Sequence, residues 1–280
     1  MVNQLVVRML VLSLRALALI TNSAIIRPVN FDYLGFLMSK LHSISQPDSI
    51  LGTDMNQLFT PEVIRGLQGF LSIVNNGINL KDGYAMSPAL AQQGLYAAEV
   101  KYLKSNPEIA QLFEERYLAP NPDLDKLAKL PKDSLGFAYA SYLLSNNYVQ
   151  DFYPPMEVVD DESYYYMRIQ QTHDIWHTVN GWLDSIGGIK LAAFQLAQTR
   201  SSLLTLAITS TTLNAIKMNQ DINPMVAFLQ EGYNVGLKAK PFLAQKWEEA
   251  WEKPLAEWRA ELNITHVRNV RTEEASLAAV

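Results

Sequence analysis

The 280-residue sequence contains no cysteine. Disulfide bonds, thiolate nucleophiles and zinc or iron–sulfur sites with cysteine ligands are therefore excluded. Strand signals are also scarce, because the chain has no clean run of alternating polar and apolar residues and no Asn-Gly turn between β-branched stretches. Lysine and arginine form no cluster and the net charge is −5, so we expect no nucleic-acid partner.

Helix signals, in contrast, recur along the whole chain. Thr60-Pro61-Glu62 combines an N-cap residue, a proline at the first helical position and an acid in the first turn. Similar signals predict further helix starts at Asn30 (running to about Ser43), Ser87 (running to about Leu103), Asn106, Asp123, Ser134, Asp160 and Asn223. Gly187-Gly188 is expected to interrupt a helix, and a helical run follows from Ile189 towards Met218 in one or two pieces.

The final part of the chain, Pro241–Leu262, carries tryptophans spaced by four and seven residues. This is helical spacing and predicts that the tryptophans pack in the core. The sequence shows no internal repeat and no long polar linker that would mark a domain boundary. It therefore predicts an all-α fold, a single domain over residues 1–280 with about ten helices and a frayed tail over residues 265–280.

The first 26 residues are almost wholly apolar. Arg8, Arg15 and Asn22 are spaced by seven, so they give the predicted helix a narrow polar edge. Arg15 lies at the centre of the run, which argues against a membrane-spanning helix, and no small-residue cleavage site of a signal peptide follows. We expect a helix that is buried or lies against a membrane, in a cytoplasmic protein with peripheral membrane association.

Two of the four histidines, His173 and His177, lie one helical turn apart within Tyr164–Gly181, with Asp174 beside them. Two neutral imidazoles and a carboxylate are ligands that Zn²⁺ and Fe²⁺ accept. The same pattern also suits a buried polar stripe that hydrogen-bonds neighbouring helices, and both interpretations remain open at this point. The polar line on this helix face continues through Tyr166, Gln170, Gly181 and Asp184.

Three segments of the chain resemble the coenzyme Q biosynthesis protein 4 family. They are Leu130–Ala140 (Leu-Pro-Lys-Asp-Ser-Leu-Gly-Phe-Ala-Tyr-Ala), the His-Asp-Ile-Trp-His motif of His173–His177, and a stretch from Gly232 to Leu262 that includes Trp247, Trp251 and Arg259. The resemblance implies an all-α peripheral membrane protein, dimeric, that holds prenylated quinone precursors beside other quinone-biosynthesis enzymes. It also implies a link to oxidative removal of a ring carboxyl group at a metal site.

In that family the metal motif continues with a glutamate twelve residues after the second histidine, and here this position is Ile189. The resemblance implies His173, Asp174 and His177 as ligands of a divalent Zn or Fe ion. With the fourth ligand absent, three ligands plus water could still hold a metal. A phosphate oxygen could complete the shell around Mg²⁺.

We favour a prenyl-lipid binding protein in ubiquinone-type quinone biosynthesis. An isoprenoid tail needs an apolar slot between helices, and small residues near the histidine motif could line one: Gly181, Gly187, Gly188, Ala192, Ala193 and Ala197. The polar head group would contact the histidine line, with Gln170, Tyr166, Asp184 and Arg168 as further candidates.

Two alternatives stay open. The first is a metal-dependent enzyme that decarboxylates a prenylated aromatic acid, with His173 and His177 as ligands and Asp174 as ligand or base. The second is a scaffold of a membrane-associated complex, anchored by the N-terminal helix, in which the polar stripe only fixes helix register.

Membrane association through the N-terminal helix can be tested by flotation with liposomes. Deletion of Val2–Ser23 is expected to abolish co-flotation of the chain, because the deletion removes the apolar surface of the helix. Co-flotation that is unchanged by the deletion would contradict this anchor.

Overall fold

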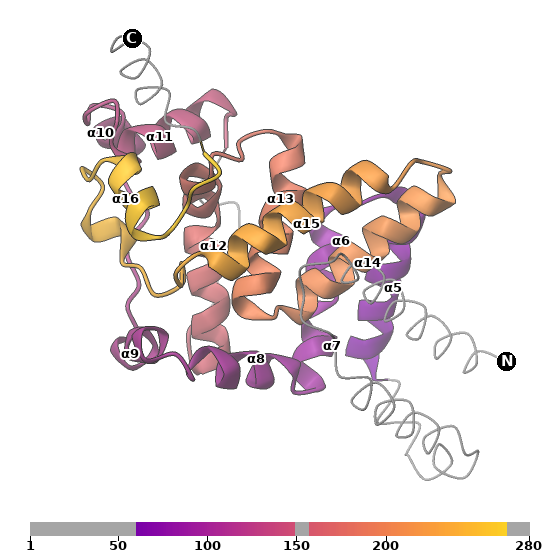
Figure 1. The fold of residues 1–280 in the computed structure, drawn as a ribbon. Helices are drawn as coiled ribbons and strands as arrows, with labels where there is room; N and C mark the ends of the chain where they lie inside the picture. The colour runs from indigo at the N-terminus through magenta and orange to yellow at the C-terminus, as the bar shows by residue number, and fades with distance from the viewer. Residues whose placement is uncertain (1–59, 149–156, 268–280) are drawn as a thin grey trace, which may run out of the picture. The chain divides into compact units, whose positions relative to one another are not determined.

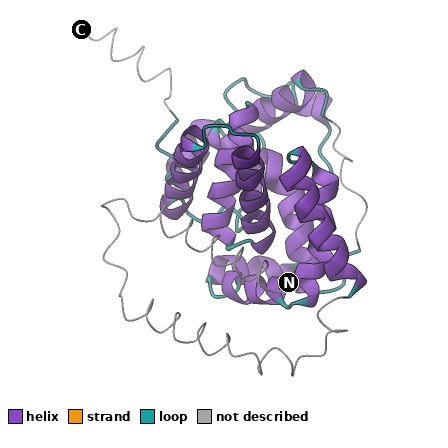
Figure 2. Ribbon diagram, turned by 90° about the vertical axis from the view of Figure 1, so that its right-hand side faces the viewer, coloured by secondary structure: helices purple, strands orange, loops and turns teal. Residues whose placement is uncertain are grey.

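The computed structural model describes residues 60–148 and 157–267 (Figure 1). Within these residues the chain forms twelve α-helices and one 3-10 helix, and no strand (Figure 2). The predicted all-α fold is therefore confirmed for this part of the chain. The α-helices are α5 (Pro61–Asn76), α6 (Leu80–Ala85), α7 (Ser87–Gln92), α8 (Leu95–Leu103), α9 (Pro107–Glu115), α10 (Leu124–Leu127), α11 (Leu135–Ser145), α12 (Asp161–Asn180), α13 (Ser185–Thr199), α14 (Ser202–Lys217), α15 (Asn223–Lys238) and α16 (Leu255–Glu261); the 3-10 helix is η2 (Trp247–Glu249).

Several predicted features lie outside the described residues. They are the apolar helix over residues 1–26, the helix from Asn30 to Ser43 and most of the tail. Among the helices that are described, none combines the length and the apolar character needed to cross a membrane.

The described helices belong to two compact units. The first contains α5, α6, α7 and most of α14, and the second contains α8 to α13, α15, η2 and α16. The single-domain organisation expected from the sequence stays a prediction. All residues of the histidine motif belong to the second unit.

The predicted helix starts are confirmed where the sequence supplies a capping side chain. The side-chain oxygens of Thr60, Asn106 and Ser134 each accept a backbone N–H from the first turn of the helix that follows. At the start of α12, Asp160 and Ser163 form a reciprocal capping box. Each cap satisfies an N–H that has no partner within the helix and stabilises the helix by about 1 kcal/mol.

Glycine accounts for two boundaries that the sequence predicted wrongly. The single helix expected from Ser87 to Leu103 is two helices, because Gly94 adopts a φ of +69° before α8. Gly187 and Gly188, in contrast, do not interrupt a helix but lie inside α13. Asp184 fixes the start of α13, since its side chain accepts the Gly187 N–H at 2.8 Å.

The core of the second unit contains a series of aromatic rings from three segments. Trp176 of α12 packs on Phe242, Phe242 on Trp247 and Trp247 on Trp258, with ring centroids 5.6, 5.3 and 4.7 Å apart. The prediction that the C-terminal tryptophans are core residues is confirmed for Trp247 and Trp258, which are buried. Their segment is mostly non-helical, because only η2 and α16 form within Pro241–Leu262.

A close approach of backbones joins α13 and α15. A Cβ atom on Gly232 would lie 2.0 Å from the carbonyl oxygen of Lys190, and one on Gly236 would lie 2.6 Å from that of Phe194. Both glycines are needed because any side chain would separate the two helices. The close approach to α13 also gives a structural reason for Gly232 and Gly236, two glycines of the segment Gly232–Leu262 that resembles the family.

A buried ion pair joins α12 to the C-terminal segment. The Arg168 guanidinium is fully buried and donates to both carboxylate oxygens of Glu248, at 2.6 and 3.0 Å. It also donates to the backbone oxygen of Gln245 at 2.8 Å, and it stacks 5.1 Å from the ring centre of Tyr117. Arg168 therefore fixes the segment around η2 against the middle of α12.

Removal of one partner of this pair should destabilise the protein strongly. Glu248→Ala would leave a buried guanidinium without its counter-charge, and we expect the free energy of unfolding to fall by about 3 kcal/mol. Glu231→Ala is the control, since the Lys190–Glu231 pair is partly exposed and should contribute less than about 1 kcal/mol. Chemical denaturation followed by tryptophan fluorescence measures both values, and equal losses would contradict the role given to Arg168.

Candidate functional site

The histidine motif lies in the C-terminal half of α12. His173 and His177 meet edge to face, with ring centroids 4.9 Å apart. The helix ends directly after the motif, because Gly181 adopts a φ of +67° and turns the chain back towards α13. The turn places Trp182 beside the last turn of α12.

His177 is held by the backbone of the residue that follows this turn. Its Nδ1 lies 2.6 Å from the carbonyl oxygen of Trp182, and the Trp182 N–H donates to the His177 carbonyl at 3.1 Å. The side chain is buried. The sequence predicted the helix face of His177 but not this backbone partner.

Tyr142, in the C-terminal half of α11, lies beside His177, and Tyr148, which follows α11, packs on Tyr142. The Tyr142 ring lies 6.1 Å from that of His177, and the Tyr148 ring lies 5.6 Å from that of Tyr142. Burial, followed by the influence of Tyr148 and of the Asp174 carboxylate, raises the pKa of Tyr142. The Tyr142 phenol therefore keeps its proton at neutral pH and remains a hydrogen-bond donor.

The two imidazoles are neutral at physiological pH. Burial lowers the pKa of His173 to about 4, and burial together with the neighbouring His173 lowers the pKa of His177 to about 4. Burial also raises the pKa of Asp174, which His177 partly counteracts. The site thus offers neutral hydrogen-bonding groups with a single carboxylate beside them.

The described residues around the histidine pair do not supply a complete ligand set for a divalent metal. In the part of the chain that the structure describes, no three histidine, aspartate or glutamate side chains gather closely enough to hold a metal ion. Ile189, at the position where the resemblance implies a glutamate, is an apolar residue of α13. The described residues therefore do not fit a family-type metal site, and we derive no chemistry through a metal.

The other predicted head-group residues have different surroundings. Arg168 is engaged by Glu248 and Gln245, as described above. Tyr166 packs on Tyr96 of α8, with ring centroids 6.0 Å apart, and Asp184 caps α13. Gln170 is half-buried one turn before His173. The structure thus brings Tyr142 and Tyr148 to the histidine pair but places Arg168 and Tyr166 against other elements.

The small residues expected to line an isoprenoid slot serve close packing in part. The Cα of Gly187 packs against Trp182, and Ala197 packs against Gly236 of α15. At these two positions the space is filled by neighbouring helices and the turn after α12.

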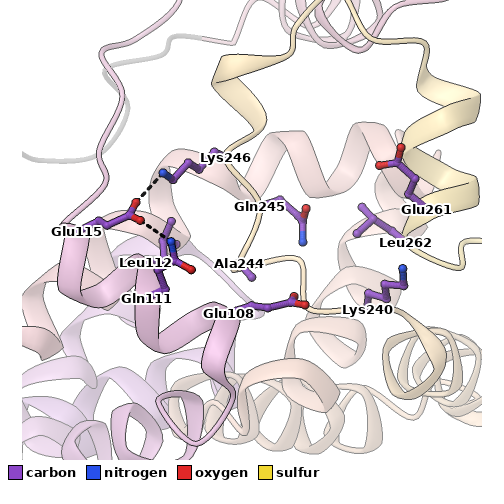
Figure 3. Close-up of a pocket in the computed structure, with 10 residues that line it drawn as sticks. All are labelled: Glu108, Gln111, Leu112, Glu115, Lys240, Ala244, Gln245, Lys246, Glu261 and Leu262. Carbon is purple, nitrogen blue, oxygen red and sulfur yellow. Dashed lines mark hydrogen bonds and ion pairs between the residues drawn. The ribbon is translucent and has the colours of Figure 1, made fainter.

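Two cavities of the second unit lie away from the histidine pair. A cleft of about 470 Å³ between α9 and the C-terminal segment is lined largely by charged side chains, of which Glu115 binds Lys246 and Gln111 (Figure 3). A second groove of about 460 Å³ is lined without charged side chains, by residues that include Tyr102, Ile109, Ala197 and Leu237. The first cleft does not suit an isoprenoid tail, because burying its charged walls under hydrocarbon would be costly.

Sequence reasoning missed Tyr142, Tyr148 and the Trp182 carbonyl. Neither tyrosine is marked by a motif, and their position depends on how α11 packs on α12. The carbonyl carries no side-chain signal at all. The only related signal was Gly181, whose place after the motif predicts a turn that brings the following residues back to the helix end.

The fold and the site define a class of all-helical protein with a buried, neutral histidine pair at the end of a central helix. The chain matches the family model described as coenzyme Q (ubiquinone) biosynthesis protein Coq4 over residues 87–268. Since this match covers more than half of the chain, the protein belongs to the Coq4 family of ubiquinone biosynthesis proteins, as the resemblance predicted.

Relatives and a solved structure agree with this assignment. The chain is 31% identical over 152 residues to the mitochondrial ubiquinone biosynthesis protein COQ4 of Zygosaccharomyces rouxii, covering 53% of this chain and 46% of the relative. It is 31% identical over 162 residues to that of Saccharomyces cerevisiae strain AWRI1631, covering 55% and 48%. The chain therefore spans about half the length of these curated relatives.

The solved structure comes from Nostoc punctiforme PCC 73102 and is named for ubiquinone biosynthesis. It is 32% identical to the chain, with a TM-score of 0.63, and the comparison covers 72% of this chain and 98% of that one. The chain thus shares its helical fold with this solved structure over 72% of its length.

The depressed pKa of His177 predicts a stability change with pH. Its folded pKa of about 4 lies below the ordinary value of 6.5, so the unfolded chain gains the proton first as the pH falls. The contribution is fully present above pH 6.5 and is lost progressively as the pH falls towards 4. At pH 5 the loss for this one group should be about 2 kcal/mol.

Unfolding free energies of the wild-type chain and His177→Gln at pH 7.5 and pH 5 measure this loss. The variant should lose about 2 kcal/mol less than the wild type between the two values, because glutamine does not titrate. The same loss in both proteins would show that His177 is not buried as a neutral group.

Proposed function

We propose that the chain binds a prenylated aromatic lipid, an isoprenoid quinone or its precursor, in ubiquinone biosynthesis. The head group lies at the His173–His177 end of α12. Family membership supports the pathway. The observation that carries the binding proposal is the set of neutral, half-buried or buried polar groups beside exposed apolar side chains.

Polar groups of the site match the head group of such a lipid. A phenol hydroxyl can donate to an imidazole nitrogen. A ring oxygen can accept from the Tyr142 hydroxyl, which keeps its proton, in place of the hydrogen bond that this hydroxyl makes with Tyr148. Both contacts are neutral, so desolvation on binding costs little compared with burying charged groups. A purely structural polar stripe would not need a phenol and two unprotonated imidazoles in one place.

Large apolar side chains occur in the segments that flank these groups and suit the first isoprene units. Leu144 lies in the last turn of α11 and Tyr148 three residues after its end, and Leu183 and Ile186 lie in and after the turn that holds His177. All four side chains are exposed, between 37% and 50%. Large apolar side chains that remain exposed around polar groups are typical of a binding surface for an amphiphile.

The remaining partners form part of the same proposal. A prenyl tail that extends beyond Leu144, Tyr148, Leu183 and Ile186 would continue into a membrane surface. This fits the peripheral membrane association expected from the sequence. A second copy of the chain and other quinone-biosynthesis enzymes are further partners, as the resemblance implies. Decarboxylation at a metal stays an alternative, which requires ligands beyond those that the described residues assemble.

Binding can be measured with 4-hydroxybenzoate that carries a geranyl chain, by titration calorimetry in detergent. His177→Leu and Tyr142→Phe should each weaken binding about tenfold, because each removes one hydrogen-bonding group from the head-group contact. Tyr233→Phe removes a hydroxyl from an exposed tyrosine of α15 and should leave binding unchanged.

The same titration with added Zn²⁺ or Mg²⁺ tests the metal alternative. We expect the affinity to be unchanged by either ion. No binding of the geranylated probe to the wild-type chain, with or without metal, would overturn the proposed function.

A further inference from the structure

We propose that Gly187 is a positioning residue for the histidine site. By leaving room for the Trp182 carbonyl, it fixes His177 with a proton on Nδ1 and a free acceptor at Nε2. The ligand contact of Nε2 rests on the proposed function, whereas the tautomer and the role of Gly187 do not.

The space around Gly187 is closed by backbone atoms. A Cβ atom at this position would lie 2.4 Å from the Trp182 carbonyl oxygen and 2.6 Å from its carbon. Backbone atoms cannot rotate away as a flexible side chain would, so any larger residue must displace the carbonyl. Gly187 lies inside α13 without a positive φ, so glycine is required here for space and not for backbone freedom.

The start of α13 holds Gly187 at this distance. Its N–H is shared by two acceptors of Asp184, the side-chain oxygen at 2.8 Å and the backbone oxygen at 3.0 Å. Asp184 follows Trp182 by only two residues. Moving Gly187 away from the Trp182 carbonyl must therefore either break this cap or change the backbone of the short turn between Trp182 and Asp184.

The Trp182 carbonyl, which lies next to Gly187, also determines the tautomer of His177. It lies 2.6 Å from Nδ1, and a carbonyl oxygen can only accept a hydrogen bond. Nδ1 must therefore carry the proton. In the neutral ring Nε2 then has the lone pair, and it makes no hydrogen bond within the described residues.

A lone pair at Nε2 selects the chemistry of the group that binds there. It accepts a hydrogen bond from a hydroxyl, so it favours a phenol or hydroquinone head group over one whose facing oxygen cannot donate. A geranylated 4-hydroxybenzoate should therefore bind at least tenfold more tightly than its 4-O-methyl ether. With Gly187→Ala this preference should shrink or vanish.

The tautomer can be read directly from the ¹⁵N chemical shifts of histidine-labelled protein, with His177 assigned by comparison with His177→Gln. In the wild-type chain Nδ1 should show the shift of a protonated nitrogen and Nε2 that of an unprotonated one. Gly187→Ala should move both shifts towards averaged values and weaken binding of the geranylated probe at least tenfold.

Gly188→Ala is the matched control, because a Cβ atom at Gly188 would meet nothing within 4 Å. It should leave both the shifts and the affinity at their wild-type values. Wild-type shifts of His177 in Gly187→Ala would overturn the inference. A proton on Nε2 of His177 in the wild-type chain would also overturn the inference. This second measurement needs only the wild-type protein, so it tests the inference even if Gly187→Ala does not fold.

The two proposals fail in different ways. The predicted tautomer in a wild-type chain that binds neither probe would overturn the proposed function and leave the role of Gly187 intact. Binding of the probe by a chain with Nε2 protonated would overturn only the role of Gly187.

Discussion

The buried pair of Arg168 and Glu248 is the constraint on which the second unit depends. Arg168 lies in the middle of α12, and its two bonds to Glu248 tie the largely irregular C-terminal segment to that helix. The aromatic series from Trp176 to Trp258 then packs between them. The C-terminal segment fixes α12 along the side that carries Arg168. The opposite side of the helix can therefore carry the histidine motif, whose side chains make few hydrogen bonds within the protein.

The histidine end of α12 is built mainly from neutral groups, with the Asp174 carboxylate beside them. Burial keeps His173 and His177 unprotonated and Tyr142 protonated. Such a site suits the proposed head group, which would be held by directional hydrogen bonds and not by opposite charge. This property separates it from the charged cleft between α9 and the C-terminal segment, where lysine and glutamate side chains already pair with one another.

Local signals in the sequence were sufficient for many helix starts of the described chain but not for the site. Capping residues such as Thr60, Asn106 and Asp160 predict helix starts because the cap is formed within four residues. The histidine spacing likewise predicts a shared face. Tyr142 and the Trp182 carbonyl reach His177 only through packing of α11 and through a backbone turn, which residue types do not encode. Gly187 looked like a helix breaker for the same reason, since its need for space comes from a residue outside its helix.

The proposed position of the head group of a prenylated aromatic lipid, at the end of α12, can be tested by a crystal structure of the chain with geranylated 4-hydroxybenzoate. We expect the ring hydroxyl within hydrogen-bond distance of His177 Nε2, with the first isoprene unit against Leu183 or Leu144. Density for the ring in the charged cleft lined by Glu108 and Lys240, with the histidine pair unoccupied, would contradict it.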